Sequence, residues 1–180
     1  MMTELPTNTP AETPFWRFSL SFYRQAGVAE ACIALQDGCG VDVNLMLFLL
    51  WLAADGRQLS IEAVKELDEA VRSWRELTII PIRALRRKLK GAATLVEAGK
   101  QEAFRTRVKA LELEAERLQQ EALHGRSRSL ARSSQAPPPA AARANLAAYE
   151  ELLRTPFPKA AVDRLLAAFV ALKFDDFAAS

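Results

Sequence analysis

The residues with the clearest chemical potential lie in a glycine-hinged polar turn, residues 36–44. Two carboxylates stand five positions apart in it, and its polar side chains are Gln36, Asp37, Asp42 and Asn44. Two carboxylates that converge across a turn could bind a cation or serve as an acid/base pair. The same residue types also begin and end helices, because Asp and Asn accept hydrogen bonds from free backbone N–H groups. We favour this structural interpretation, with Asp42 as the cap of the helix that follows.

A second candidate is a run of five cations without an acid in residues 83–90. Four of them fall at helical spacing, and we treat these as candidate anion-binding residues: Arg83, Arg86, Arg87 and Lys90. Such a face could bind the phosphate of a nucleotide, a lipid headgroup or a nucleic acid. The alternative is a face neutralised by a partner helix, and the acids available for this are Glu112, Glu114, Glu116 and Glu121. We favour neutralisation because an antiparallel partner would place these acids opposite the cations.

No other stretch carries a recognisable chemical motif. The sequence has no glycine-rich phosphate loop, serine nucleophile elbow, paired CxxC or His-Glu-x-x-His. His124 is the only histidine, and a metal site or catalytic dyad would need partners that the sequence does not place beside it. We therefore predict no catalytic residue, no metal site and no cofactor, and we lean against an enzyme.

The elements that position these residues are predicted to be helices. Half of the 180 residues are hydrophobic and only seven are glycine, while Ala and Leu are abundant, which favours helix over strand. Residues 45–54 form the most apolar run, about half the roughly 20 residues that a membrane-spanning helix needs. We predict an all-α, compact multi-helix bundle with this run as its buried central helix. Trp16, Trp51 and Trp74 are expected to be core anchors.

Two segments with heptad-like spacing predict an antiparallel, coiled-coil-like helical hairpin. Apolar residues step by three and four from Ile82 to Val96, and again from Phe104 to Ala122, on either side of a short turn at residues 98–100. Around this hairpin we divide the chain into a flexible N-terminus, a helical core domain, a Ser/Arg/Pro-rich linker and a small C-terminal helical pair that forms an appendage: residues 1–12, 13–124, 125–142 and 143–180.

Charge and cysteine content set the expected surroundings. The net charge of +2 creates no strong overall attraction to nucleic acid or to an anionic membrane. Cys32 and Cys39 are seven positions apart, too far to be bridged if they share a helix, so we expect both to be reduced. The first residues lack the basic and apolar regions of a secretory signal. We expect a cytoplasmic protein without a membrane segment.

Several motifs resemble a family of short proteobacterial helical proteins of unknown function. The resemblance covers about residues 14–123. It rests on Leu35-Gln36-Asp37, on Asp42-Val43-Asn44-Leu45-Met46-Leu47-Phe48, and on Pro81-Ile82-Arg83 with Arg86-Arg87 and Leu89-Lys90. It implies a small cytosolic helical protein. Because the family has no activity that we can name, it implies no catalytic residues.

The sequence leaves three functional hypotheses in order. The first is a non-enzymatic protein–protein interaction or adaptor module, with a protein partner or a homo-oligomer as the expected assembly. The second is a binder of a phosphate-bearing ligand or of nucleic acid through the basic helix 83–90. The third is an enzyme or metal site at the turn 36–44.

Overall fold

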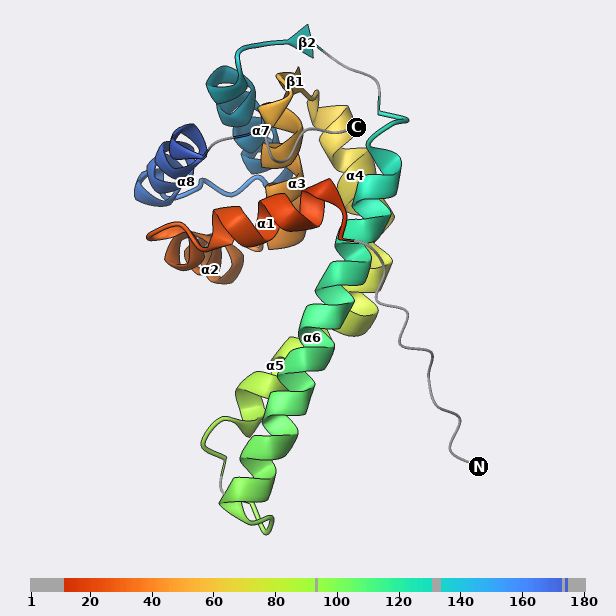
Figure 1. Cartoon of the computed structure of the whole chain (residues 1–180), viewed down its shortest axis with the longest axis vertical. Helices are drawn as coiled ribbons and strands as arrows, with labels where there is room; N and C mark the ends of the chain where they lie inside the picture. The colour runs from red at the N-terminus through yellow and green to blue at the C-terminus, as the bar shows by residue number, and fades with distance from the viewer. Residues whose placement is uncertain (1–11, 93, 131–133, 173, 175–180) are drawn as a thin grey trace.

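The computed structural model describes residues 12–92, 94–130, 134–172 and 174 (Figure 1). Within them the chain is helical apart from loops and one pair of two-residue strands, so the all-α prediction is confirmed. The helices are α1 (Pro14–Tyr23), α2 (Val28–Cys39), α3 (Val43–Ala54), α4 (Ile61–Trp74), α5 (Ile80–Leu89), α6 (Ala98–Arg126), α7 (Pro138–Leu153) and α8 (Lys159–Ala171). The strands β1 (Arg57–Gln58) and β2 (Ser134–Gln135) pair antiparallel. The predicted flexible segment 1–12 lies outside the described residues, except for residue 12.

Capping side chains fix the start of three helices, and the cap at Asp42 is the predicted one. Thr13 caps α1, Asp42 caps α3 and Ser60 caps α4, each by accepting a hydrogen bond from a backbone N–H of the first turn. The cap on α3 matters most, because it sets the end of the central helix where the polar turn begins.

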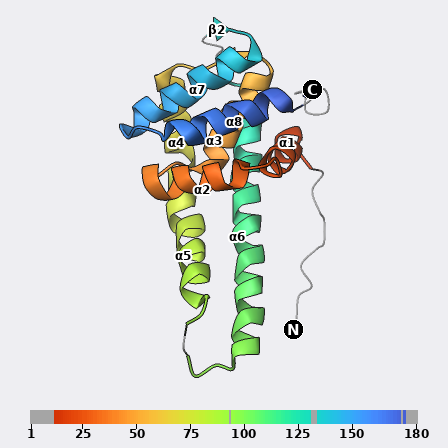
Figure 2. The same ribbon diagram turned by 90° about the vertical axis from the view of Figure 1, so that its left-hand side faces the viewer.

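Helix α3 is the centre of a helical body, as its composition predicts. Every residue from Asn44 to Ala53 is buried, and α1, α6 and α7 pack around the helix (Figure 2). Phe15 of α1 contacts Phe48 and Trp51 of α3, with ring centroids 5.1 and 5.6 Å apart. Among the described residues we find no helix whose length and hydropathy would let it span a bilayer.

The C-terminal helices belong to this body, which corrects the predicted appendage 143–180. Helix α7 starts at Pro138 and packs against α3 and α4, and α8 packs against α2. Asn145 is fully buried; its amide donates to the carbonyls of Leu49 and Arg57 and accepts from the N–H of Leu59. The segment 125–142 is therefore only in part a linker. Proline fits the first turn of a helix, where its missing N–H has no partner to lose, and the alanines that follow allow close packing.

The predicted hairpin is present and projects from the body as an arm (Figures 1 and 2). Helix α4 continues through a π-helical turn, Arg75–Ile79, directly into α5, so Pro81 does not break the chain direction. A π turn gives up one i→i−4 bond, the kind of bond that proline cannot complete. The connection to α6 is the segment 90–97 rather than the predicted turn at residues 98–100, which lie inside α6.

The hairpin buries little. Helix α5 contributes no buried residue, and the predicted apolar seam of α6 is split. Val108 and Ala115 are buried, whereas Phe104, Leu111 and Leu118 are exposed. Trp74 is also half exposed, so the prediction that all three tryptophans are core anchors holds only for Trp16 and Trp51.

Candidate functional site

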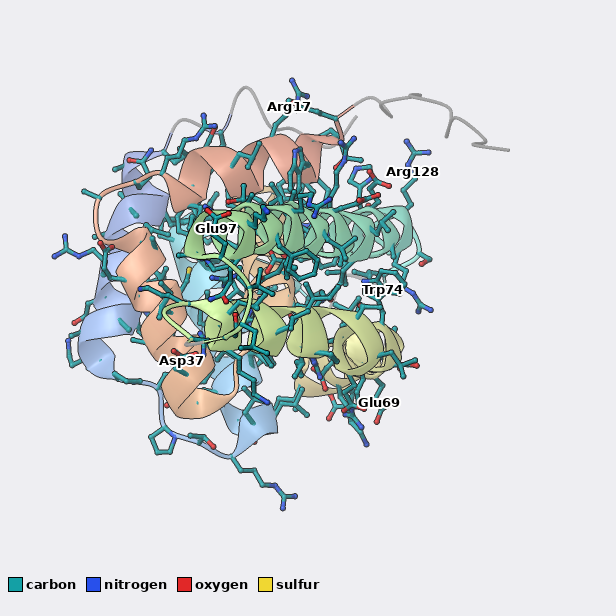
Figure 3. All side chains as sticks on the ribbon, turned by 90° about the horizontal axis from the view of Figure 1, so that it is seen from below. Arg17, Asp37, Glu69, Trp74, Glu97 and Arg128 are labelled. Carbon is teal, nitrogen blue, oxygen red and sulfur yellow. The ribbon has the colours of Figure 1, made fainter. Side chains whose placement is uncertain are left out.

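A large cleft lies between the body and the arm. Its volume is about 900 Å³, within the size range of small-molecule sites. Helices α1 and α2 line one side, the start of α3 lines the floor, and α5 and α6 line the other side. Figure 3 shows the molecule from the hairpin tip, with side chains projecting into the space between these helices. Helices from opposite ends of the first 120 residues thus meet at one concave surface.

The predicted basic residues form one wall of this cleft. Arg83, Arg86, Arg87 and Lys90 all line it, because positions separated by three and four residues share one face of α5. The opposite flank of α5, which carries Leu85, does not contribute to the lining.

Two of these arginines are neutralised by α6, as the favoured interpretation predicts. Arg83 donates to Glu112 at 2.9 Å and to Glu116 at 2.6 Å, and Arg86 also pairs with Glu112. Burial alone would raise the pKa of Glu112, but the hydrogen bonds from Arg86 and Arg83 outweigh it and hold that pKa below its ordinary value. Burial dominates at Glu116, whose pKa is raised although Arg83 acts against it.

The carboxylates of the polar turn have separate partners. Asp37 is exposed at the end of α2 and pairs with Arg87 of α5 at 2.9 Å, which lowers the pKa of its carboxyl group. Asp42 is buried and accepts from Arg75 at 3.0 Å and from the amide of Gln119 at 2.6 Å. We find no arrangement in which the two carboxylates act together.

Asp42 instead joins four helices. Besides capping α3, it binds Arg75 at the end of α4 and Gln119 of α6, and its own N–H donates to the hydroxyl of Tyr149 in α7 at 3.0 Å. Burial raises the pKa of that hydroxyl, which keeps Tyr149 neutral and able to accept this bond. Asp42 thus has the capping role that the sequence predicts and a wider structural role that it does not reveal.

The inner end of the cleft carries buried polar atoms without partners. Gln120 donates to the side-chain oxygen of Asn44 at 2.8 Å, but its own Oε1 has no hydrogen-bond partner. The hydroxyl of Ser19, on the buried stripe of α1, also has none. Both residues line the cleft and are only 3% exposed. Buried polar atoms in folded proteins are normally satisfied, so these two oxygens are exceptions, each with unused capacity for a hydrogen bond.

The cleft also presents cations that no described acid neutralises. Arg24, Lys90 and Lys109 are exposed at its rim, and none forms an ion pair within 4.0 Å with another residue that the structure describes. Arg24 and Lys90 directly follow α1 and α5, and Lys109 lies in α6. A negatively charged group at the rim would therefore meet free positive charge from three segments.

The part of the chain that forms the cleft matches a known protein family. Residues 14–123 match the family described as Protein of unknown function (DUF2390). The chain belongs to that family. The match extends from the first turn of α1 into α6 and includes every residue that lines the cleft, whereas α7 and α8 lie outside it. Searches of curated proteins and of solved structures give no significant match.

The lining of the DUF2390 cleft includes the thiol of Cys32. Burial raises the pKa of the Cys32 thiol to about 12, so this side chain is no thiolate nucleophile at neutral pH. Within the described part of the chain, no three His, Cys, Asp or Glu side chains are grouped so that they could hold a metal ion. The cleft is thus a concave surface with a largely apolar lining, one basic wall, and buried unpaired oxygens of Ser19 and Gln120.

The residues predicted from the sequence make up part of the lining of this DUF2390 cleft. Gln36, Asn44 and the four basic residues were predicted, whereas the following lining residues were missed: Ser19, Tyr23, Arg24, Lys109 and Gln120. One signal for Ser19 was available, because it shares the apolar stripe of Phe15, Phe18 and Phe22 at helical spacing. A lone hydroxyl among buried aromatics needs a partner. The other missed residues sit in helices rich in similar side chains and carry no such mark.

Proposed function

We propose that this protein is a non-enzymatic binding module that holds an organic anion in the cleft. The observation that carries the proposal is the coincidence, on one largely apolar cleft, of three cations and two buried oxygens. Among the residues that the structure describes, the cations have no acid partner and the oxygens have no hydrogen-bond partner. The acid group of the ligand would lie at Arg24, Lys90 and Lys109. Its hydrogen-bond donor would reach Gln120 Oε1.

The lining supports one chemical class of ligand. Trp16, Tyr23 and Leu113 offer aromatic and aliphatic surface between the rim and the inner end. A compound with a flat or elongated apolar body and one phosphate or carboxylate group fits this sequence of surfaces. Nucleic acid fits less well, because its phosphate backbone needs a row of free cations and Arg83, Arg86 and Arg87 are already paired.

Binding of anilinonaphthalene sulfonate, an aromatic anion whose fluorescence rises in apolar sites, tests the proposal directly. The double variant Lys90→Glu with Lys109→Glu reverses two rim charges and should weaken binding by about tenfold or more. The matched control is Lys88→Glu with Lys100→Glu, which changes the same charges on the same helices away from the cleft lining. Equal weakening by both double variants would overturn the proposal.

Competition against this probe separates the possible ligand sources. Inorganic phosphate carries only the acid group, adenosine monophosphate adds a heteroaromatic body with donors, and octanoate adds an aliphatic body. Preference for the nucleotide would identify a base at the inner end, and preference for octanoate would identify an acyl chain. Displacement by phosphate as strong as by either organic anion would contradict a role for the apolar walls.

An interaction or adaptor function is the second candidate. It is favoured by the large apolar side chains that the projecting hairpin exposes, among them Leu85, Phe104, Leu111 and Leu118. A purified chain that is monomeric at every concentration would leave these side chains available to another protein. We also propose that the protein is cytoplasmic and of proteobacterial origin. We further propose that the two helices of the hairpin pair as in a coiled coil.

A further inference from the structure

The flank of α6 that faces away from the cleft carries a row of exposed apolar side chains. Phe104, Leu111 and Leu118 are 44, 51 and 46% exposed and follow one another at intervals of seven residues. Seven residues are nearly two helical turns, so the three side chains lie in line, roughly 10 Å apart. We call them the α6 row. None of them lines the cleft.

We propose that the α6 row is covered by the same row of a second copy, with the two α6 helices antiparallel and Leu111 at the two-fold axis. Leu111 stands midway between the other two members, so the arrangement places Phe104 of each copy opposite Leu118 of the other. An interface of this kind is self-complementary, because the same contacts occur twice. It also supplies the hairpin, a single layer of two helices, with the second layer that it lacks.

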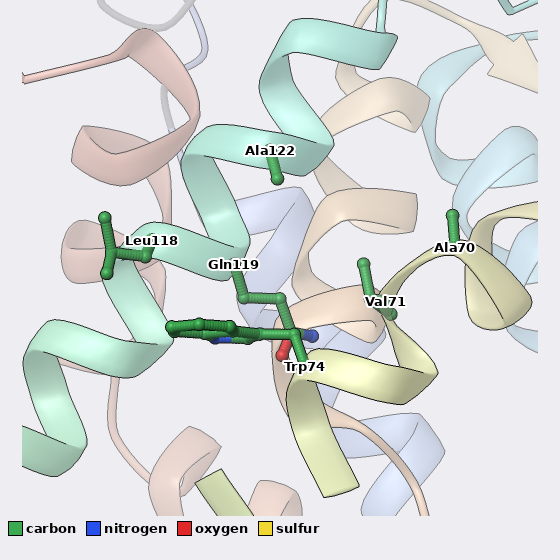
Figure 4. Close-up of a pocket in the computed structure, with 6 residues that line it drawn as sticks. All are labelled: Ala70, Val71, Trp74, Leu118, Gln119 and Ala122. Atoms are coloured by element: carbon green, nitrogen blue, oxygen red, sulfur yellow. The ribbon is translucent and has the colours of Figure 1, made fainter. Parts of the chain in front are cut away.

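A hollow beside Leu118 has the size and character that this pairing requires. Its volume is about 310 Å³, and it is lined by Ala70, Val71, Trp74, Leu118, Gln119 and Ala122 (Figure 4). An apolar cavity of about 150 Å³ is enough to hold a benzene ring. Phe104 of the second copy, placed opposite Leu118, would insert its ring here beside the flat face of Trp74.

The charges that flank the row complement themselves in the same arrangement. Arg107 lies four residues before Leu111, and Glu114 lies three residues after it, both on the same edge of the row. Antiparallel pairing therefore brings Arg107 of each copy within about 1.5 Å, along the helix axis, of the level of Glu114 of the other. Both side chains are exposed, and neither has an ion pair with another described residue, although the Arg107 guanidinium lies over the Phe104 ring. A parallel arrangement would not give these two reciprocal pairs.

Sedimentation of the full chain over a range of concentrations tests the assembly. We expect a monomer–dimer equilibrium that Arg107→Glu and Glu114→Arg each weaken by about tenfold or more, since each creates two like-charge contacts. Combining the two substitutions restores opposite charges and should restore the dimer. The control Lys109→Glu, two residues from Arg107 but in the cleft, should leave it unchanged. A chain that is monomeric throughout, or a double variant as weak as the singles, would overturn the proposal.

Cross-linking through a single introduced cysteine tests the register. In a Cys39→Ala background, Leu111→Cys should form an intermolecular disulfide under oxidation because the two copies of this position meet at the axis. Phe104→Cys should not, because its two copies lie roughly 20 Å apart along the helices. Phe104 and Leu111 are exposed and Cys39 is only partly buried, so we expect folding to be retained, and circular dichroism checks it. Cross-linking of both variants would indicate a parallel pair, and cross-linking of neither would exclude this interface.

Discussion

The body and the hairpin arm are stabilised in opposite ways. The body is built around α3, a helix that is apolar on nearly every face and fully covered, with its one polar end satisfied by Asp42. The arm contains α5, a helix without a single buried residue, held to α6 mainly by Arg83 and Arg86 on Glu112. Burial of apolar surface is insensitive to salt, whereas ion pairs at a partly exposed interface are weak and screened. The body therefore supplies the stability, and the arm supplies surfaces for binding.

Truncating one leucine in each region should give the largest contrast. Leu49→Ala removes a fully buried side chain from α3 and should lower the free energy of unfolding by about 2–5 kcal/mol. Leu85→Ala removes a side chain of α5 that is 44% exposed and should cost about 0.5–1 kcal/mol. Urea denaturation followed by circular dichroism measures both. Similar losses would contradict the division between the two regions.

The two carboxylates of the polar turn give a second, electrostatic test of the difference between the body and the arm. Asp42→Ala removes a helix cap and leaves Gln119 and part of Arg75 without a partner, so we expect a loss of about 3 kcal/mol. Asp37→Ala removes only an exposed pair with Arg87 and should change stability by about 0.5 kcal/mol or less.

A third variant and a change of salt separate the causes of that difference. Asp42→Asn keeps a capping oxygen but not the charge, and it should fall between wild type and Asp42→Ala. Added salt should reduce the small effect at Asp37 and leave the large one at Asp42 nearly unchanged. A large, salt-insensitive loss at Asp37 would show that the arm is tied to the body more firmly than its contacts indicate.

The sequence predicts the body better than the site, for a physical reason. Local signals such as the cap at Asp42, the proline at position 14 and the apolar run 45–54 act within a few residues of one another. They determine the helices independently of the tertiary contacts that form later. The cleft depends on where α1 and α6 meet. Ser19 and Gln120 each carry an oxygen without a hydrogen-bond partner in the folded chain, so no local pattern in either helix marks them. The packing of the C-terminal helices on the body is not predictable from the sequence for the same reason, since Asn145 has partners only in distant segments.

Glu116, which lines the cleft, provides the most specific test, and the one with the smallest expected effect. The pKa of Glu116 is raised, first by burial and then by the nearby carboxylates of Glu112 and Asp42, although Arg83 opposes the shift. Tyr23 also faces this group, but its own pKa is raised above 10.0, so it stays neutral in the range considered. Glu116 therefore keeps its proton to a higher pH when folded than when unfolded. Its contribution to stability is fully present below 4.5, the ordinary pKa of a glutamate carboxyl group, and is lost as the pH rises through the folded pKa.

The protonation of Glu116 that stabilises the fold should also strengthen anion binding in the cleft. Protonation of Glu116 removes one negative charge, so an anion should bind more tightly as the pH falls through the folded pKa of this group. Anilinonaphthalene sulfonate suits the measurement because its sulfonate stays ionised throughout. Glu116→Gln fixes the neutral state and should strengthen binding at neutral pH by a few-fold, about 1 kcal/mol or less, while flattening the pH dependence above 4.5. Glu102→Gln makes the same change on the exposed part of α6 and should do neither. If both variants retain the wild-type pH profile, Glu116 does not face the bound anion, and the ligand lies nearer the rim cations than the inner oxygens.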